Sequence, residues 1–380
     1  MLSPMKHAVS MKTARKILYA SAMLMVPSAF AQTGALGCFA ASPSATARIA
    51  ACTQGLETGT LPADTRALAL LARAEAFAAL GETKSALADF DAALLLTPND
   101  PAALVARANL HEFIGNPAQA EADYTAALAA DAGLTEPYVR RGALRLRRGA
   151  AEEGIADLSE ARRLSPENPA PSKLRGTYFL NKGDAAQAVI ELRQAADLDP
   201  GDTEVQSLLA AARLRAGQAD EALAPYTSAL NANPKNAAAL RGRATAHAQA
   251  QNYAAAIADF SAALALNPKD IAALEGRGMA ALQSGNFASA TTDFSLLEAL
   301  RPGDGAPLFF RANARLQNGD FSEAEADFSS FLEIHTEDAE ALMGRALARQ
   351  STGDHIGAEA DLSALLDKVP EAARPLASRG

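Results

Sequence analysis

The stretch AAALRGRATAHAQAQNYAAAIADFSAALALNPKD (residues 237–270) predicts two helices joined by a tight turn. Its first half keeps small and apolar residues on one helical face, and this periodicity breaks near Gln251. A second apolar series follows and stops at Pro268, a residue that ends helices. The stretch therefore indicates a helical hairpin of about 34 residues.

The same hairpin recurs along most of the chain with a constant period. Proline returns in register at Pro98, Pro166, Pro200, Pro234, Pro268, Pro302 and Pro370. A period that accumulates no insertion over this length predicts a stack of repeats that bury their apolar faces only against their neighbours. We count nine units between residues 67 and 372.

Other positions repeat with the proline. The first helix carries a small residue at Ala74, Ala108, Gly142, Gly176, Ala210, Ala244, Gly278, Ala312 and Ala346. Large residues recur on the second helix at Phe90, Tyr124, Leu158, Leu192, Tyr226, Phe260, Phe294, Phe328 and Leu362. Between the two helices eight of the nine units have a glycine, which suits a left-handed helix cap.

These residues resemble tetratricopeptide repeats. The resemblance covers about four-fifths of the chain, and its form has an Arg-small pair in the first helix and an acidic-aromatic pair in the second, as in Arg243-Ala244 and Asp259-Phe260. It implies an all-α, right-handed superhelical solenoid whose first helices line a concave groove for a protein or peptide partner. It implies no catalysis and no cofactor.

The N-terminus has the features of an export signal. A positively charged start, an apolar stretch and the small residues Ala29 and Ala31 predict a signal peptide over residues 1–31, cleaved after Ala31. We expect an N-terminal segment with a degenerate repeat helix at 32–66, the nine repeats at 67–372 and a tail at 373–380. The expected location is the bacterial periplasm or the exterior, without a transmembrane segment after cleavage.

Charge narrows the classes of partner. The full chain has 35 basic and 44 acidic residues, and the expected cleavage removes four of the basic ones. An acidic protein of this kind has no general affinity for nucleic acid.

Cys38 and Cys52 are the two cysteines of the chain, and both follow the expected cleavage site. In an exported protein such a pair favours a disulfide, here between the N-terminal segment and the predicted helix at 45–57. The alternative is a lipid on Cys38, because Ala35-Leu36-Gly37-Cys38 is similar to a lipobox. A lipid would make the chain an envelope lipoprotein that assists assembly of outer-membrane or secretion complexes.

One arginine position and one acidic position recur together. The arginine is at residues 73, 107, 141, 175, 243, 277, 311 and 345, and the acid at 89, 123, 157, 191, 259, 293, 327 and 361. The fifth unit lacks both and has Leu209 and Pro225 instead. Because a half-buried charge without a partner is costly, joint loss predicts that each arginine pairs with an acid in a structural ion pair. Pro225 should also kink or shorten its helix.

The resemblance places certain first-helix positions in the groove. Its centre would hold a basic band, Arg147, Lys173, Arg215 and Arg241. Its C-terminal half would be more apolar, with Met279, Leu282, Phe309, Leu316 and Met343. Such a groove suits an extended or helical peptide with acidic groups; the alternative is that these residues only solvate the face or pack between repeats.

Signals for an enzyme are weak. The histidines are scattered, and the sequence has no His/Cys cluster at metal-ligand spacing and no Gly-rich phosphate loop. His111 and His247 share one repeat position, so we interpret them as structural. We therefore expect a non-enzymatic scaffold or adaptor. We also expect Leu362, Leu365 and Leu366 of the last repeat to be partly uncovered, which would allow two chains to form a homodimer there.

Overall fold

The computed structural model describes residues 38–39 and 44–366 of the 380-residue chain. Across these residues the regular elements are helical and no strand occurs. In the same part of the chain, no helix is both long and apolar enough to cross a membrane. The expected signal peptide and the expected C-terminal tail lie outside the described residues.

Helix α2 (Ala45–Glu57) precedes a regular series of helical hairpins. The hairpins are α3 (Ala63–Ala79) with α4 (Thr83–Leu96), α5 (Pro101–Phe113) with α6 (Pro117–Ala130), α7 (Thr135–Arg148) with α8 (Ala151–Leu164), α9 (Ala170–Lys182) with α10 (Ala185–Leu198), α11 (Thr203–Arg215) with α12 (Ala219–Ala232), α13 (Ala237–Gln249) with α14 (Tyr253–Leu266), α15 (Ile271–Gln283) with α16 (Phe287–Leu300), α17 (Gly305–Asn318) with α18 (Phe321–Ile334) and α19 (Ala339–Thr352) with α20 (His355–Leu366). Helix α3 begins at Ala63, ahead of the boundary expected at residue 67.

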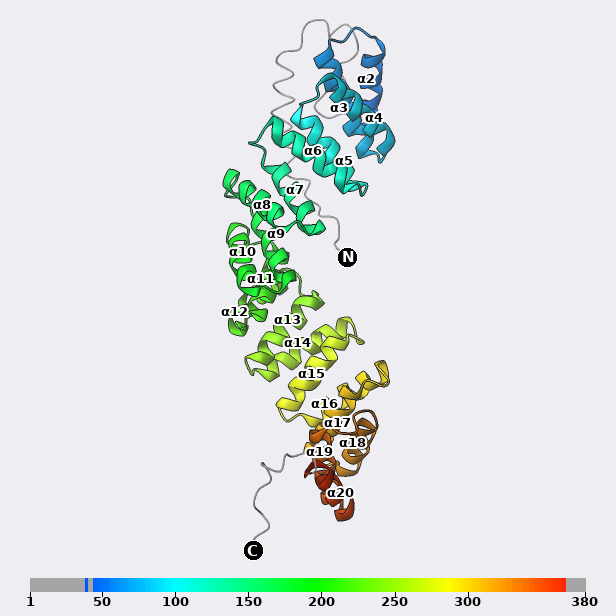
Figure 1. The fold of residues 1–380 in the computed structure, drawn as a ribbon, viewed down its shortest axis with the longest axis vertical. Coiled ribbons are helices and arrows are strands. Elements are labelled where there is room, and N and C mark those ends of the chain that lie inside the picture. The colour runs from blue at the N-terminus through cyan, green and yellow to red at the C-terminus, as the bar shows by residue number, and fades with distance from the viewer. Residues whose placement is uncertain (1–37, 40–43, 367–380) are drawn as a thin grey trace. The chain divides into compact units, whose positions relative to one another are not determined.

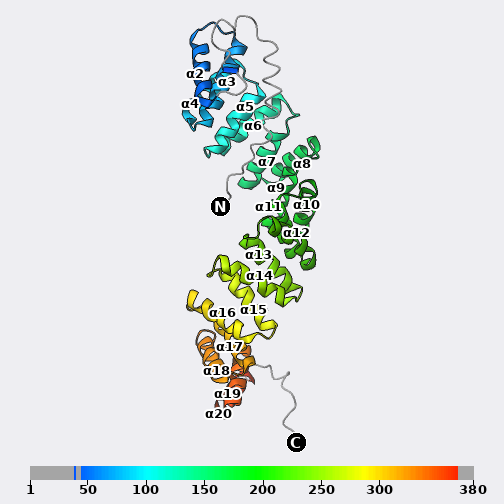
Figure 2. The same cartoon turned by 180° about the vertical axis from the view of Figure 1, so that it is seen from behind.

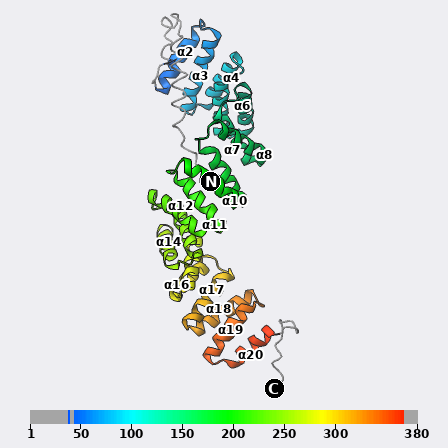
Figure 3. The same ribbon diagram turned by 90° about the vertical axis from the view of Figure 1, so that its left-hand side faces the viewer.

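The chain forms two compact units, divided after Leu174 within α9. In the N-terminal unit α2 packs on α3, and the hairpins then follow in chain order (Figure 1). In the C-terminal unit each second helix packs on the next first helix, as α14 does on α15 (Figure 2) and α18 on α19 (Figure 3). First helices of neighbouring hairpins also contact each other, α3 with α5 in one unit and α13 with α15 and α17 with α19 in the other. First helices therefore line one side of each stack.

Small residues allow this close approach. Each repeated Ala or Gly of the first helix is buried, and the large residue of the second helix fills the space beside it. A second position on the first helix that requires a small residue was not predicted from the sequence. Gly242, Gly276 and Gly344 face the ring of the preceding second helix, and a Cβ on Gly276 would lie only 2.2 Å from Phe260 Cζ. Any larger residue there would have to displace the ring.

The hairpin turns confirm the predicted left-handed caps. All eight repeated glycines have a positive φ, for example 93° at Gly149. The sixth hairpin has no glycine there, and Gln251 takes the left-handed conformation with φ 58°. Among the described residues it is the single non-glycine with positive φ. This backbone carries a steric cost for an L-residue.

The fifth hairpin corrects one part of the prediction for Pro225, namely that the proline shortens its helix. Helix α12 keeps 14 residues, as many as α10 and α14, so the proline does not shorten it. A proline has no amide hydrogen, which deprives the carbonyl of Glu221, four residues earlier, of its helical donor. Arg213 on α11 donates from Nη1 to this carbonyl at 2.8 Å. The neighbouring helix thus supplies the missing hydrogen bond.

Candidate binding groove

The repeated arginines pair with the repeated acids, as predicted. Arg243 donates from Nε and Nη2 to the two carboxylate oxygens of Asp259, at 2.7 and 2.8 Å. The equivalent pairs are Arg73–Asp89, Arg107–Asp123, Arg141–Asp157, Arg175–Glu191, Arg277–Asp293, Arg311–Asp327 and Arg345–Asp361. The acids are buried, and the hydrogen bond to Asp259 raises the pKa of Arg243. These charges hold the hairpin together and are not open to a ligand.

The same guanidinium also reaches the preceding hairpin, which the sequence analysis did not predict. Arg243 Nη1 donates to Thr227 Oγ1 on α12 at 3.2 Å. Equivalent bonds join Arg141 to Thr125, Arg277 to Ser261, Arg311 to Ser295 and Arg345 to Ser329, and Arg73 makes a similar bond to Thr53 of α2, outside the repeat register. We call these contacts the arginine ladder. A Ser or Thr that repeats with the hairpin period was the available signal.

In the fifth hairpin an apolar pair replaces the ion pair. Leu209 is 4% exposed, and Pro225 is also buried. A buried ion pair can give way to apolar residues without a loss of stability when both charges disappear together. The fifth hairpin is consistent with that principle.

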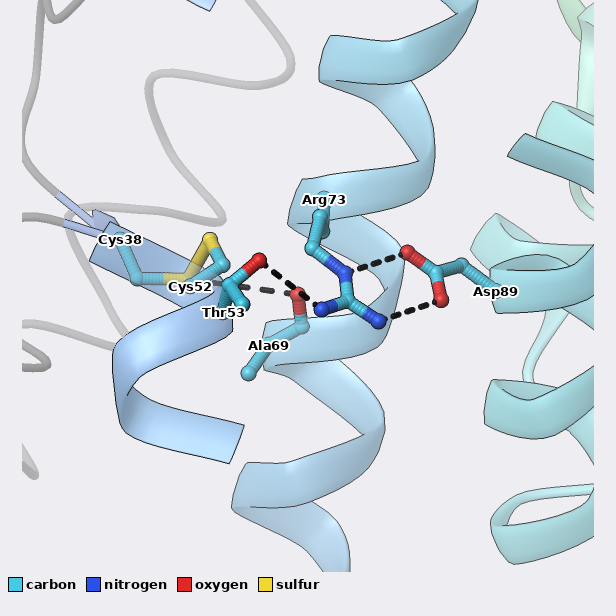
Figure 4. Close-up of a disulfide and its surroundings, with 6 residues drawn as sticks. All are labelled: Cys38, Cys52, Thr53, Ala69, Arg73 and Asp89. Carbon is cyan, nitrogen blue, oxygen red and sulfur yellow. Dashed lines mark hydrogen bonds and ion pairs between the residues drawn. A yellow bond between two sulfur atoms is a disulfide. The ribbon is translucent and has the colours of Figure 1, made fainter. Parts of the chain in front are cut away.

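The predicted disulfide between Cys38 and Cys52 is present. Figure 4 shows it at α2, beside the first step of the arginine ladder, where Thr53 meets Arg73. Cys38 Sγ also lies 4.0 Å from the carbonyl oxygen of Ala69 on α3. The bridge therefore fixes residues 38–39 to α2 where α2 packs on the first hairpin. A lipid on Cys38 would need the sulfur that the disulfide already uses.

The five predicted apolar residues come together in the C-terminal unit. Met279, Leu282, Phe309, Leu316 and Met343 all line one pocket of about 830 Å³ between α15, α17 and α19. Phe310, Leu347 and Leu365 extend its apolar wall. Met343 and Leu347 are 40% and 46% exposed, so large apolar groups are available at its surface.

A second pocket of about 300 Å³ continues this surface toward α13. The two pockets share Met279 and Gln283. We call the combined surface the apolar groove; its lining comes mainly from α13, α15, α17 and α19. Its position on consecutive first helices agrees with the predicted face.

Three exposed glutamines run along the apolar groove, one per hairpin, and were missed in the sequence analysis. They are Gln249, Gln283 and Gln317, near the C-terminal ends of their first helices. Each primary amide offers two donors and one acceptor oxygen. One charged residue, Glu340, lies on the wall of the larger pocket. The groove therefore offers apolar contacts and neutral hydrogen bonds, with little charge.

The predicted basic band has a different character. Lys173 is 8% exposed and so presents little surface to a partner. Arg147 is half exposed but donates to Glu112 Oε1 at 2.8 Å. Arg215 donates to the carbonyl of Leu180 at 2.9 Å, and Arg241 lies 3.3 Å from Asp270. The two arginines of the C-terminal unit lie outside the lining of the apolar groove.

The histidine position carries structural contacts in other hairpins. His111 and His247 share it with Arg145, Arg315 and Arg349, each of which donates to a buried aspartate of its own hairpin. Within the described residues, no group of three or more His, Cys, Asp or Glu side chains could hold a metal ion.

Comparison with known proteins supports the repeat assignment. A family model described as Tetratricopeptide repeat matches residues 139–203, 207–271, 249–305 and 311–373, more than half of the chain. A search of curated proteins gives no match.

Several solved structures are similar in fold. YrrB, described as a tetratricopeptide protein with an unusual peptide-binding site, has a TM-score of 0.46 and 23% identity, covering 50% of this chain and 97% of that one. A repeat protein from Parabacteroides merdae has a TM-score of 0.46 and 17% identity over 65% of this chain and 98% of its own. PilW, described as a widely conserved type IV pilus biogenesis factor, has 0.45 and 17% over 55% and 96%.

The sequence model and the architecture agree with each other. Within the described residues, the matched stretches coincide with helical hairpins of constant period, whose two helices are joined by left-handed turns. The chain belongs to the tetratricopeptide repeat family.

Proposed function

We propose that this protein is a non-enzymatic scaffold that holds an extended peptide segment with apolar side chains in the apolar groove. The observation that carries the proposal is the gathering of Met279, Phe309, Met343 and Leu347 around one pocket on the first helices. Apolar groups exposed together in a concave surface are typical of binding sites for a partner. Met side chains also adapt to ligands of different shape.

The glutamine row supports an extended ligand over a helical one. A helix satisfies its backbone hydrogen bonds internally, whereas an extended segment presents free N–H and C=O groups. Gln249, Gln283 and Gln317 are exposed along the groove, and their amides can bond to both kinds of group. Apolar side chains of the ligand would then enter the pockets between the amides.

The charged residues of the predicted basic band support an acidic ligand less well than the apolar groove supports an apolar one. The three arginines of the expected basic band already contact Glu112, the Leu180 carbonyl and Asp270. Binding a ligand carboxylate there would compete with these contacts. We propose that acidic groups on the ligand have at most a secondary role, at the exposed Arg147.

We further propose that the protein acts in the bacterial periplasm or outside the cell. The signal-like residues 1–31 support export, and the Cys38–Cys52 bridge supports an oxidising compartment. The envelope lipoprotein is the weaker alternative, because Cys38 Sγ is bonded to Cys52.

The proposal can be tested with peptides that bind the full chain and are selected from a random display library. Fluorescence anisotropy should show that Leu347→Glu weakens a selected apolar peptide about tenfold or more, because the variant places a charge in the apolar groove. The matched control is Ile356→Glu, since Ile356 is 85% exposed and lies outside the groove lining. Gln283→Ala should weaken the peptide less. Equal loss in both Glu variants would contradict the assignment, provided circular dichroism shows equal helicity.

A further inference from the structure

Methionine occurs at one surface of the described chain. The sequence has seven methionines, and five of them fall within residues 1–31, the predicted signal peptide. The other two, Met279 on α15 and Met343 on α19, both line the larger pocket of the apolar groove. Three helices separate α15 from α19 along the chain. The fold therefore brings together the two methionines that the predicted mature chain retains.

The repeat does not require methionine at either position. The position of Met279 is occupied in other hairpins by Ala211, Thr245, Asn313 and Leu347. The position of Met343 is occupied by Ser207, Arg241, Glu275 and Phe309. Side chains of such different shape show that the stacking of hairpins does not depend on a thioether there. Met343 is 40% exposed, so it does not fill a gap in a closed core either.

A thioether differs from the other apolar side chains of the groove in its reaction with oxidants. A two-electron oxidant such as hydrogen peroxide converts methionine to its sulfoxide. The sulfur lone pair bonds to one peroxide oxygen while the O–O bond breaks. The hydroxide released then takes the proton of the new S–OH group and leaves as water. Sulfur is oxidised, peroxide is reduced, and an apolar side chain becomes polar.

We infer that Met343, and more slowly Met279, are oxidation sites through which a peroxide switches off ligand binding in the apolar groove. The inference rests on the proposed function. Met343 is exposed, whereas Met279 is partly buried at the junction of the two pockets. A sulfoxide places a strong hydrogen-bond acceptor in a wall that includes Phe309 and Leu347, and an apolar ligand would have to desolvate it without replacing its bonds to water. Enzymatic reduction of the sulfoxide restores the thioether, so the switch is reversible.

Peroxide treatment of the full chain tests the inference, with a selected apolar peptide that lacks Met and Cys as the ligand. The chain has no Trp, and its two cysteines form the disulfide, which leaves methionine as the side chain that peroxide oxidises most readily. Mass spectrometry of proteolytic fragments should show sulfoxide at Met343 before Met279, and saturating peptide should slow both reactions. Fluorescence anisotropy should show about fivefold weaker binding or more after oxidation, and a methionine sulfoxide reductase should restore it.

Two variants separate the groove from the rest of the chain. Met279→Leu/Met343→Leu keeps the five methionines of residues 1–31 as targets. Whatever its starting affinity, peroxide should not change its binding of the peptide. Met343→Gln introduces a polar side chain without an oxidant, and it should bind the peptide more weakly than Met343→Leu does. Circular dichroism should show equal helicity for all forms.

Three results would overturn the inference. The first is unchanged affinity of a chain that carries sulfoxide at both groove methionines, and the second is an equal loss of affinity in the double leucine variant after peroxide. The third is unmodified Met343 under conditions that oxidise the methionines of residues 1–31. If Leu347→Glu still weakened the peptide, the proposed function would stand in each case. If Leu347→Glu had no effect, the proposed function would fail as well.

Discussion

In the arginine ladder, each arginine joins three helices through one guanidinium. Arg243 contacts Asp259 on its own hairpin and Thr227 on the preceding one. We predict that Arg243→Leu lowers the free energy of unfolding by about 3 kcal/mol, because Asp259 would remain buried without its cation. The double variant Arg243→Leu/Asp259→Leu should recover much of this loss, as the pair Leu209 and Pro225 indicates. Urea unfolding measures both, and equal destabilisation of the single and double variants would contradict the pairing.

The turn at Gln251 offers a test of backbone strain. Its φ of 58° is unfavourable for a residue with a Cβ. We predict that Gln251→Gly raises the free energy of unfolding by about 1 kcal/mol, because glycine adopts this conformation without steric cost. Gln251→Ala is the control, since alanine keeps the Cβ and should give no comparable gain in thermal or urea unfolding. A similar gain from both variants would mean that side-chain loss, and not φ, is responsible.

At the scale of one element, α12 depends on its neighbour. Arg213 Nη1 donates to the carbonyl oxygen of Glu221. This carbonyl has no donor within its own helix, because Pro225 has no amide hydrogen. We predict that Arg213→Met costs about 1 kcal/mol in urea unfolding, because this carbonyl loses its bond. In the Pro225→Ala background the restored amide can donate to the same carbonyl, so the cost of Arg213→Met should fall. Equal costs in the two backgrounds would show that the arginine acts in another way.

We expect the stabilising effect of the disulfide to be confined to α2 and α3. Its two cysteines are 14 residues apart, a separation for which loop closure contributes about 3 kcal/mol. We predict that Cys38→Ser/Cys52→Ser increases hydrogen exchange in α2 and α3, because these helices pack on each other. Exchange in α15 to α18 serves as the internal control and should not change, since repeats contact only their neighbours. Faster exchange throughout the chain would contradict a local role.

At the scale of the whole molecule, the repeat determined how much could be predicted from sequence. A fixed period places equivalent residues in equivalent surroundings, which is why the arginine–acid pairs, the glycine turns and the apolar side of the groove were predicted. The solvent exposure of a residue was harder to predict, because it depends on contacts between neighbouring hairpins. Lys173 shares a first-helix position with exposed residues and is nevertheless buried. The hydrogen bond from Arg213 to the Glu221 carbonyl was likewise not predictable, because it depends on the distance between α11 and α12.

Several features of the site escaped prediction for a different reason. Gln249, Gln283 and Gln317 are common polar residues, and only their alignment beside the apolar pockets makes them notable. The hydroxyls of the arginine ladder repeat in the sequence, but small polar residues on a helix are usually solvated. Their role becomes visible once the preceding hairpin is packed against the arginine.

The central claim is that the apolar groove of the C-terminal unit binds the partner. Photo-crosslinking with benzoylphenylalanine at position 347 or position 356 of the full chain tests it most directly, using a peptide selected on the protein. Leu347 lines the groove, whereas Ile356 is exposed outside it. The account predicts a peptide crosslink from position 347 and none from position 356. A crosslink from position 356 with none from position 347 would contradict it.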